Sequence, residues 1–154
     1  MINIGIISVS DRAFNKVYQD EGIPEIEKIF SSLNSFQILK KIVIPDEKET
    51  IKENLIELSD IDKLDIIITT GGTGPSSRDV TPDATIEVID REYPGFGEYM
   101  RLESLNYSKN AILSRQTAGT RGKSLILNLP GNPKSISELL PNLISQLKHF
   151  IEKR

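Results

Sequence analysis

Short apolar segments that end abruptly in a glycine, proline or aspartate loop are the feature that most restricts how this chain can fold. They are rich in Ile, Val and Leu and occupy residues 3–9, 36–44, 64–70 and 124–129. Between them, apolar residues recur at steps of three and four, which is the period of an amphipathic helix. Buried strands that alternate with such helices form βαβ units. The sequence therefore predicts a three-layer α/β/α fold with a mostly parallel sheet.

The same periodicity gives the expected helices. They cover residues 21–33, 47–58, 82–89 and 96–105, and a last helix over residues 136–151 is expected to break near Leu140 because Pro141 follows it. A short strand is expected at residues 111–113. Residues 117–122 are small and contain two glycines, which favours either a flexible, ligand-covering loop or an ordinary connection. No repeat or linker interrupts the chain, so residues 1–154 are expected to form one domain.

Composition excludes several kinds of site and partner. The chain has no cysteine and one histidine, which excludes disulfides, thiolate nucleophiles and metal sites built on Cys or on clustered His. The formal net charge is -3, so no basic excess points to nucleic acid. No apolar run reaches the ~20 residues of a membrane helix, and the start of the chain lacks the pattern of a signal peptide. We therefore expect a soluble, cytoplasmic protein that acts on small molecules and has no membrane or nucleic-acid partner.

A glycine loop follows the third apolar segment, at the end of a strand where parallel-sheet proteins bind ligands. Residues 70–75 read Thr-Gly-Gly-Thr-Gly-Pro, and glycines allow successive backbone N–H groups to approach a phosphate because no Cβ blocks the way. A tight turn that uses glycine only for its positive φ explains the same residues, and both interpretations stay open at this point. The loop is not the dinucleotide fingerprint, because Ser77 stands where the third glycine belongs.

Two aspartates, Asp46 and Asp79, lie in the loops that follow the second and third apolar segments. If the corresponding strands are neighbours, the two carboxylates converge at one edge of the sheet. Two carboxylates together with ligand phosphates are what Mg²⁺ usually takes, so these residues are the candidate metal ligands and catalytic groups. The alternatives are that Asp46 caps a helix and that Asp79 forms a salt bridge with Arg78 or Arg115.

Other polar loop residues could donate hydrogen bonds to a phosphate or a polar ring, although exposed residues of these types are usually only solvated. They are Ser10, Asp11, Ser114, Arg115, Lys134 and Ser135. The one histidine, His149, lies in the terminal helix, far in sequence from every candidate loop. A Ser-His-Asp triad built on it is therefore not expected.

Five motifs, spread over nearly the whole chain, together resemble the MogA/MoaB family of molybdenum-cofactor biosynthesis. They are SVSDR at residues 8–12, TTGGTGPSSRDVTPDAT at 69–85, PGFGEYM at 94–100, AILSRQTAG at 111–119 and LPGNPKS at 129–135. Within this family, YQDEGIP at residues 18–24 and IPDE at residues 44–47 are similar to the MogA branch, the molybdopterin adenylyltransferases.

The resemblance implies an enzyme that transfers AMP from Mg-ATP to the terminal phosphate of molybdopterin and releases pyrophosphate. It also implies a homotrimer similar to the G domain of gephyrin, and a transient contact with a molybdenum-insertion enzyme. The alternative is a carrier that binds molybdopterin without catalysis, or a MoaB-like paralogue, in which case ATP is not consumed. The expected substrates are thus molybdopterin and ATP, with Mg²⁺ as the metal.

Carried over residue by residue, the resemblance places the family's two functional aspartates at Asp46 and Asp79. It assigns phosphate and nucleotide binding to Thr70, Gly71, Gly72, Thr73, Gly74 and Pro75. The remaining ligand-side positions that it implies are Ser10, Asp11, Ser114, Arg115, Pro130, Gly131, Asn132, Lys134 and Ser135.

Overall fold

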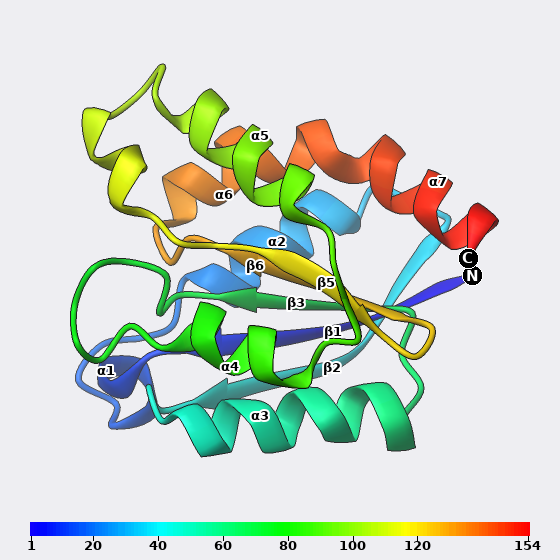
Figure 1. Cartoon of the computed structure of the whole chain (residues 1–154), viewed down its shortest axis with the longest axis horizontal. Coiled ribbons are helices and arrows are strands. Elements are labelled where there is room, and N and C mark those ends of the chain that lie inside the picture. Colours follow the sequence, from blue (N-terminus) through cyan, green and yellow to red (C-terminus); the bar gives the residue numbers. More distant parts are fainter.

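One six-stranded sheet runs through the computed structural model, which describes residues 1–154 (Figure 1). Its strand order is β2-β1-β3-β6-β5-β4. The four parallel strands are β1 (Ile2–Val9), β2 (Phe36–Ile44), β3 (Ile66–Thr70) and β6 (Ser124–Leu129). Two short antiparallel strands, β5 (Ala118–Arg121) and β4 (Arg91–Glu92), complete one edge. The mostly parallel sheet predicted from the sequence is confirmed.

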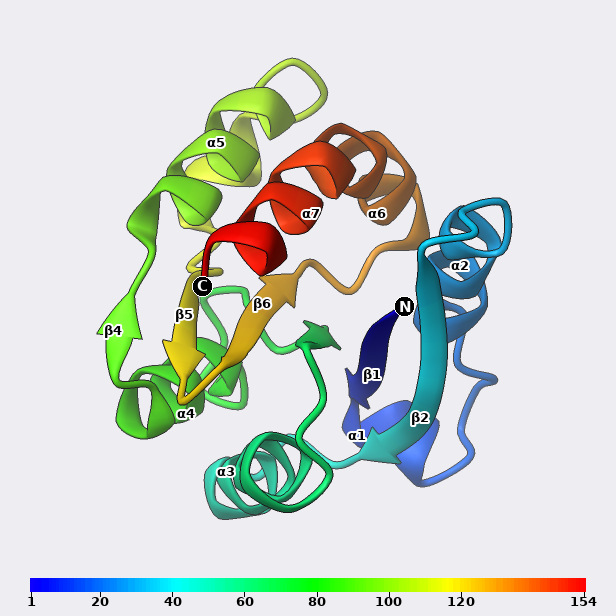
Figure 2. The same ribbon diagram turned by 90° about the vertical axis from the view of Figure 1, so that its right-hand side faces the viewer.

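Helices cover both faces of this sheet. They are α1 (Asp11–Phe14), α2 (Gly22–Phe30), α3 (Lys48–Ile56), α4 (Thr81–Val88), α5 (Pro94–Ser104), α6 (Pro133–Leu139) and α7 (Ile144–Lys153). Figure 2 shows α5, α6 and α7 on one side of the sheet and α3 and α4 on the other. The three-layer α/β/α arrangement is therefore confirmed as well.

The alternation of side chains along the central strands explains these layers. Ile66 and Ile68 of β3 pack into the cluster formed with α2, α5, α6 and α7, whereas Ile67 packs into the cluster formed with α3 and α4. All three residues are fully buried. An unbroken apolar run is thus what a strand needs when both of its faces are covered.

Several details differ from the sequence prediction. Residues 111–113 belong to a 3₁₀ helix, Lys109–Leu113, and not to a strand, and its apolar side chains are exposed. Residues 117–122, expected to be a loop, contain β5. A Cβ at Gly119 would lie 2.6 Å from the carbonyl oxygen of Arg91, so this glycine allows the close approach of β4 and does not mark a mobile segment.

The terminal helix breaks where the sequence predicts. Helix α6 ends at Leu139, a 3₁₀ turn covers Leu140–Leu143 with Pro141 in its first turn, and α7 starts at Ile144. None of the helices in the structure combines the length and the hydrophobicity that a membrane span requires.

A buried polar network fixes α4 against the sheet. The side-chain amide of Asn128, which is fully buried on β6, donates to the hydroxyls of Thr69 and Thr85 at 3.0 Å each. Its oxygen accepts a hydrogen bond from the backbone N–H of Thr117 at 3.2 Å. Because every polar atom of this amide has a partner, the network specifies one position for α4. The loop that leads into α4 carries Asp79.

Candidate active site

A pocket of about 290 Å³ lies at the carboxyl ends of β1 and β3, at the left-hand end of the sheet in Figure 1. This is the edge where parallel α/β sheets bind ligands. The pocket is lined by Ser8, Val9, Ser10, Tyr18, Asp20, Glu21, Gly22, Asp46, Thr70, Gly71, Gly72, Asp79, Gly131 and Pro133. Among the residues predicted from the sequence, those that line it are Ser10, Asp46, Thr70, Gly71, Gly72, Asp79 and Gly131.

The glycine loop has a conformation that other residues do not readily adopt. Gly71 and Gly72 have φ values of 94° and 67°. A Cβ at Gly71 would lie 2.4 Å from the carbonyl oxygen of Val9, and a Cβ at Gly72 would lie 2.2 Å from the hydroxyl oxygen of Thr81. The loop therefore lies directly over the end of β1, with its backbone in the wall of the pocket.

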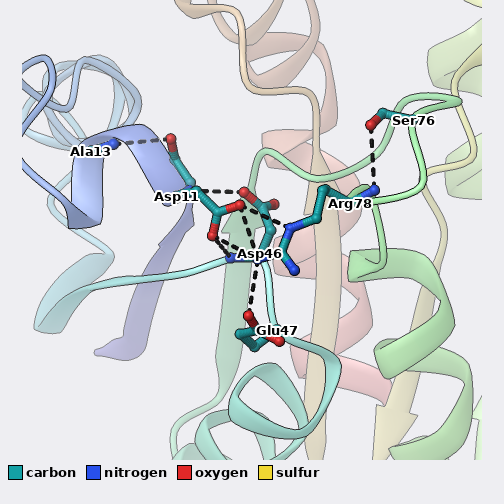
Figure 3. A network of polar contacts seen from close by, with 7 residues as sticks. Asp11, Ala13, Asp46, Glu47, Ser76 and Arg78 are labelled. Carbon is teal, nitrogen blue, oxygen red and sulfur yellow. Dashed lines mark hydrogen bonds and ion pairs between the residues drawn. The ribbon is translucent and has the colours of Figure 1, made fainter.

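Asp46 is held by a reciprocal pair of hydrogen bonds with Asp11 (Figure 3). The backbone N–H of Asp11 donates to Asp46 Oδ2 at 2.8 Å, and the backbone N–H of Asp46 donates to Asp11 Oδ1 at 2.9 Å. Burial raises the pKa of Asp46 above its ordinary value, and the nearby carboxylates of Asp11 and Asp79 raise it further. The helix-cap alternative is wrong, because α3 has Glu47 at its N-cap and no side chain caps it.

The salt-bridge alternative for Asp79 is also wrong. Its carboxylate accepts a hydrogen bond from the backbone N–H of Ser76 at 3.0 Å and pairs with no arginine. Arg78 pairs with Asp11 and Glu47, whereas Arg115 pairs with Asp83. The carboxylate of Asp79 thus remains available to the pocket that it lines.

The two aspartates line one pocket although their strands are not neighbours. Strand β1 lies between β2 and β3 in the sheet. Asp46 follows β2, and its hydrogen bonds with Asp11 hold it next to the end of β1. Asp79 reaches the pocket through the long loop between β3 and α4. The sequence-based condition that the strands be adjacent was therefore wrong, while the convergence itself is found.

Arg115, whose contact with a ligand stays a prediction, holds the loop that carries Asp79 in place. Its guanidinium donates to the backbone oxygens of Gly74 and Asp79 and forms an ion pair with Asp83 at 2.9 Å. Its own backbone N–H donates to the carbonyl oxygen of Thr73 at 2.8 Å. Ser114 donates from its hydroxyl to the side chain of Gln116. Neither Ser114 nor Arg115 lines the pocket.

The remaining predicted positions flank the pocket. The carbonyl oxygen of Pro130 accepts a hydrogen bond from the Thr70 hydroxyl at 2.8 Å. Asn132 caps α6 by accepting from the backbone N–H of Lys134 at 2.9 Å. Thr73, Gly74 and Pro75 continue the glycine loop beyond the pocket, and Lys134 and Ser135 lie in the first turn of α6. Contact of these residues with a ligand stays a prediction.

Sequence reasoning missed the contribution of the segment before α2. Asp20 lines the pocket, and its carboxylate accepts hydrogen bonds from the Ser8 hydroxyl at 2.5 Å and from the backbone N–H of Ile23 at 3.0 Å. Tyr18 lies beside it and shares a hydrogen bond of 2.9 Å with Ser10. Asp20 was not among the predicted site residues, because only the folded chain brings it to its partner Ser8 on β1.

The pocket is acidic and suits a metal only in combination with an anion. Four carboxylates line it, from Asp20, Glu21, Asp46 and Asp79, whereas no Lys, Arg or His side chain does. Asp46 and Asp79 each keep one carboxylate oxygen without a hydrogen-bond partner in the protein. No group of three or more side chains is positioned to hold a metal ion alone. These residues fit Mg²⁺, which binds through one or two carboxylates plus substrate phosphates.

A larger hollow of about 1140 Å³ lies at the opposite end of the sheet, beside α7 and the turn between β5 and β6. It contains His149 and none of the predicted site residues. His149 is therefore far from Asp46 and Asp79, and no Ser-His-Asp triad is formed. The smaller pocket is the candidate active site, because the glycine loop and both free carboxylates lie there.

The hydroxyl of Thr81 is fully buried behind Gly72 and has no hydrogen-bond partner in the protein. An unpaired buried hydroxyl is costly, so Thr81→Val is expected to raise the free energy of unfolding by about 1 kcal/mol, measured by urea denaturation. The matched control is Ser59→Ala, which removes another unpaired buried hydroxyl, located in the turn after α3. A less stable Thr81→Val protein would show that this hydroxyl is satisfied in the folded state.

Comparison with known proteins agrees with this geometry. Residues 5–149 match the family model described as "Probable molybdopterin binding domain". The chain is 54% identical to the molybdopterin adenylyltransferase of Escherichia coli K12 over 140 residues, which cover 90% of this chain and 72% of that protein. It is 46% identical to the enzyme of the same name from Helicobacter pylori 26695 over 153 residues, covering 98% and 86% of the two chains.

Solved structures give the same result. MoaB from Thermus thermophilus, described as a molybdopterin biosynthesis enzyme, superimposes with a TM-score of 0.90 at 40% identity, covering 99% of this chain and 98% of the other. The Mog protein from Mycobacterium ulcerans superimposes with a TM-score of 0.92 at 33% identity, covering 99% of both chains. From its motifs, its fold and these matches, the chain belongs to the MogA/MoaB family of molybdopterin-binding domains.

Proposed function

We propose that this chain is a molybdopterin adenylyltransferase, which transfers AMP from ATP to the terminal phosphate of molybdopterin and releases pyrophosphate. One observation carries the proposal: a glycine loop and the free carboxylates of Asp46 and Asp79 converge on one pocket at the carboxyl end of the sheet. The E. coli and H. pylori relatives with this activity in their names are 54% and 46% identical to the chain.

The glycine loop supplies phosphate binding. The backbone at Gly71 and Gly72 lines the pocket without side chains. The Gly71 N–H donates to the carbonyl oxygen of Leu129 at 3.1 Å, so the N–H of Gly72 is the one that can lie against an anion. Thr70 is fixed beside it through its hydrogen bond with the carbonyl oxygen of Pro130. A phosphate oxygen bound at the glycine loop is held at one place relative to the second reactant, which removes much of the entropic barrier.

Asp46 and Asp79 would hold Mg²⁺ against the phosphates of ATP. When bound there, the metal supplies charge neutralisation at the phosphate oxygens. The protein's own contribution is to fix the two carboxylates: Asp46 by the backbone N–H of Asp11, and Asp79 by the backbone N–H of Ser76. Each carboxylate thereby keeps one oxygen directed away from its protein partner, as a metal shared with substrate requires.

The reaction is an in-line displacement at the α-phosphorus of ATP. An oxygen of the terminal phosphate of molybdopterin forms the new bond to phosphorus, while the bond to the bridging oxygen of the β-phosphate breaks and pyrophosphate leaves with that oxygen. The protein contributes positioning and electrostatic stabilisation, as is general for transfer of phosphorus groups.

Product identity tests the proposal. Incubation with molybdopterin, Mg²⁺ and ATP labelled in its α-phosphate is expected to move the label to the pterin, as followed by chromatography. A carrier protein would bind molybdopterin and leave the label in ATP.

We further propose that the protein is a homotrimer. The resemblance to its family implies this state, and an exposed apolar patch supports association. The patch comprises Tyr99, Leu102, Leu105, Tyr107, Ile112 and Leu113, from α5, the 3₁₀ helix Lys109–Leu113 and the turn between them. Light scattering is expected to give about three times 17.2 kDa, and Leu102→Glu is expected to shift the protein toward monomer. A monomeric wild-type protein at micromolar concentration would refute the trimer.

A further inference from the structure

The charge of the active-site pocket does not match the charge of its proposed substrates. The four carboxylic side chains that line the pocket are acidic, and no basic side chain lines it. ATP and molybdopterin both carry phosphates, which carboxylates at short range repel. Mg²⁺ offsets part of this repulsion. A cationic side chain close to the pocket that could turn toward a phosphate would offset more of it.

Arg78 is such a side chain, and it bridges two of the loops around the pocket (Figure 3). Its Nε and Nη2 atoms donate to the two carboxylate oxygens of Asp11 at 3.0 Å each, and Nη2 also donates to Glu47 at 2.9 Å. All three residues sit immediately beside pocket-lining residues in the sequence: Asp11 follows Ser10, Glu47 follows Asp46, and Arg78 precedes Asp79. The guanidinium therefore lies at the rim of the pocket.

The ion pairs of Arg78 are suited to exchange. About half of its side chain, 52%, is exposed to solvent, as is 55% of that of Glu47. The exposed single contact with Glu47 contributes little to stability, whereas the bidentate pair with Asp11, whose side chain is 32% exposed, is the contact that a phosphate has to replace. A phosphate offers two oxygens to the guanidinium, as a carboxylate does, and carries more charge.

Arg115, the other arginine near this loop, cannot leave its partners without disturbing the loop. It donates to the backbone oxygens of Gly74 and Asp79, which are part of the loop itself, in addition to pairing with Asp83. Its removal from these partners would release the loop that carries Asp79. The Arg78 guanidinium contacts only the carboxylates of Asp11 and Glu47, so its departure leaves the backbone hydrogen bonds between Asp11 and Asp46 intact.

We propose that Arg78 is a substrate-binding residue that Asp11 and Glu47 hold at the rim of the empty pocket and that transfers to a substrate phosphate on binding. This inference rests on the proposed function for the identity of its substrates. The phosphate belongs either to ATP or to molybdopterin, and separate titrations with each distinguish the two. Asp11 and Glu47 then compete with the substrate for the same guanidinium.

A double-mutant cycle tests this competition. Binding of ATP in the presence of Mg²⁺, and separately of molybdopterin, is measured by calorimetry on wild type, Arg78→Gln, Glu47→Gln and the double variant. Arg78→Gln is expected to weaken binding of one substrate about tenfold, because a charge-assisted hydrogen bond is lost. Glu47→Gln is expected to strengthen binding about threefold when Arg78 is present and to have no such effect in the Arg78→Gln background.

Three results would overturn the proposal. The first is unchanged affinity of Arg78→Gln for both substrates. The second is an equal gain in affinity from Glu47→Gln in both backgrounds. The third is a loss of thermal stability or kcat in Arg78→Gln with unchanged affinity, because Arg78 would then have only a structural role. The control is Arg121→Gln, which removes an equally bidentate pair with Asp60 at the other end of the sheet and is expected to leave affinity unchanged. Arg78→Lys, which keeps the charge without the fork, is expected to fall between wild type and Arg78→Gln.

The failure of this inference and the failure of the proposed function are separable. If wild type does not transfer AMP to molybdopterin, the function is wrong whatever Arg78 does. If wild type transfers AMP and the Arg78 variants bind both substrates normally, only the role of Arg78 is wrong.

Discussion

Asp79→Asn is expected to slow adenylyl transfer by about a hundredfold or more while molybdopterin still binds. The substitution keeps the size of the side chain and an oxygen for the backbone N–H of Ser76, but it removes the charge that would hold Mg²⁺ against ATP. Metal-assisted charge stabilisation contributes several kcal/mol to such reactions, and each 1.4 kcal/mol changes the rate about tenfold. Turnover is measured as pyrophosphate release, and binding by pterin fluorescence.

Asp46→Asn is expected to behave in the same way, with one difference. The carboxylates of Asp11 and Asp46 exchange backbone hydrogen bonds, and their mutual repulsion contributes to the raised pKa of Asp46. Neutral asparagine also removes the repulsion between this carboxylate and the phosphate of molybdopterin, so molybdopterin is expected to bind as well as to wild type or more tightly. Asp60→Asn, at the opposite end of the sheet, is the control with normal turnover. Near-normal turnover of either active-site variant would remove that residue from the catalytic assignment.

Gly72→Ala is expected to reduce both phosphate binding and stability. Its Cβ would lie 2.2 Å from the hydroxyl oxygen of Thr81 and 3.1 Å from Asp46 Oδ1, on a backbone with φ of 67°. The unfavourable φ alone costs about 1–3 kcal/mol, and the steric conflict displaces the loop that faces the pocket. Affinity for ATP and for molybdopterin is expected to fall at least tenfold, and the unfolding midpoint in urea is expected to fall as well.

Two further variants separate the steric conflict from the effect of backbone conformation. Gly72→Ala combined with Thr81→Ala removes the conflicting hydroxyl and is expected to recover part of the lost stability. Gly95→Ala is the control, because a Cβ at Gly95 has no neighbour within 4 Å. If Gly72→Ala binds both substrates with wild-type affinity, the glycine loop is only a turn.

The layers of the fold follow from local sequence, but the order of the strands does not. Apolar runs such as residues 66–70 identify strands that are covered on both faces, and helical spacing identifies the helices between them. Which strands pair depends on contacts between distant residues, and the apolar runs at residues 3–9 and 64–70 do not say which of them neighbours the run at residues 36–44. The position of β1 between β2 and β3 was therefore not predictable from these patterns.

Candidate site residues could be predicted where they directly follow a strand. They could not be predicted where their position depends on contacts with residues distant in the sequence. Asp46 and Asp79 were found because they lie in loops at strand ends. Arg78, however, was considered only as one possible salt-bridge partner of its neighbour Asp79, and it pairs with Asp11, 67 residues away. Asp20 shows the same effect: its hydrogen bond with Ile23 is local, whereas its hydrogen bond with Ser8 depends on the folded chain.

Molybdopterin-dependent release of pyrophosphate tests the central claim most directly. Purified protein is mixed with ATP and Mg²⁺, molybdopterin is added in known amounts, and pyrophosphate is measured with a coupled assay. The account predicts one pyrophosphate per molybdopterin consumed, no release without molybdopterin, and loss of release in Asp79→Asn. Tight binding of molybdopterin by the wild-type protein without any pyrophosphate release would contradict the account and would identify the chain as a carrier.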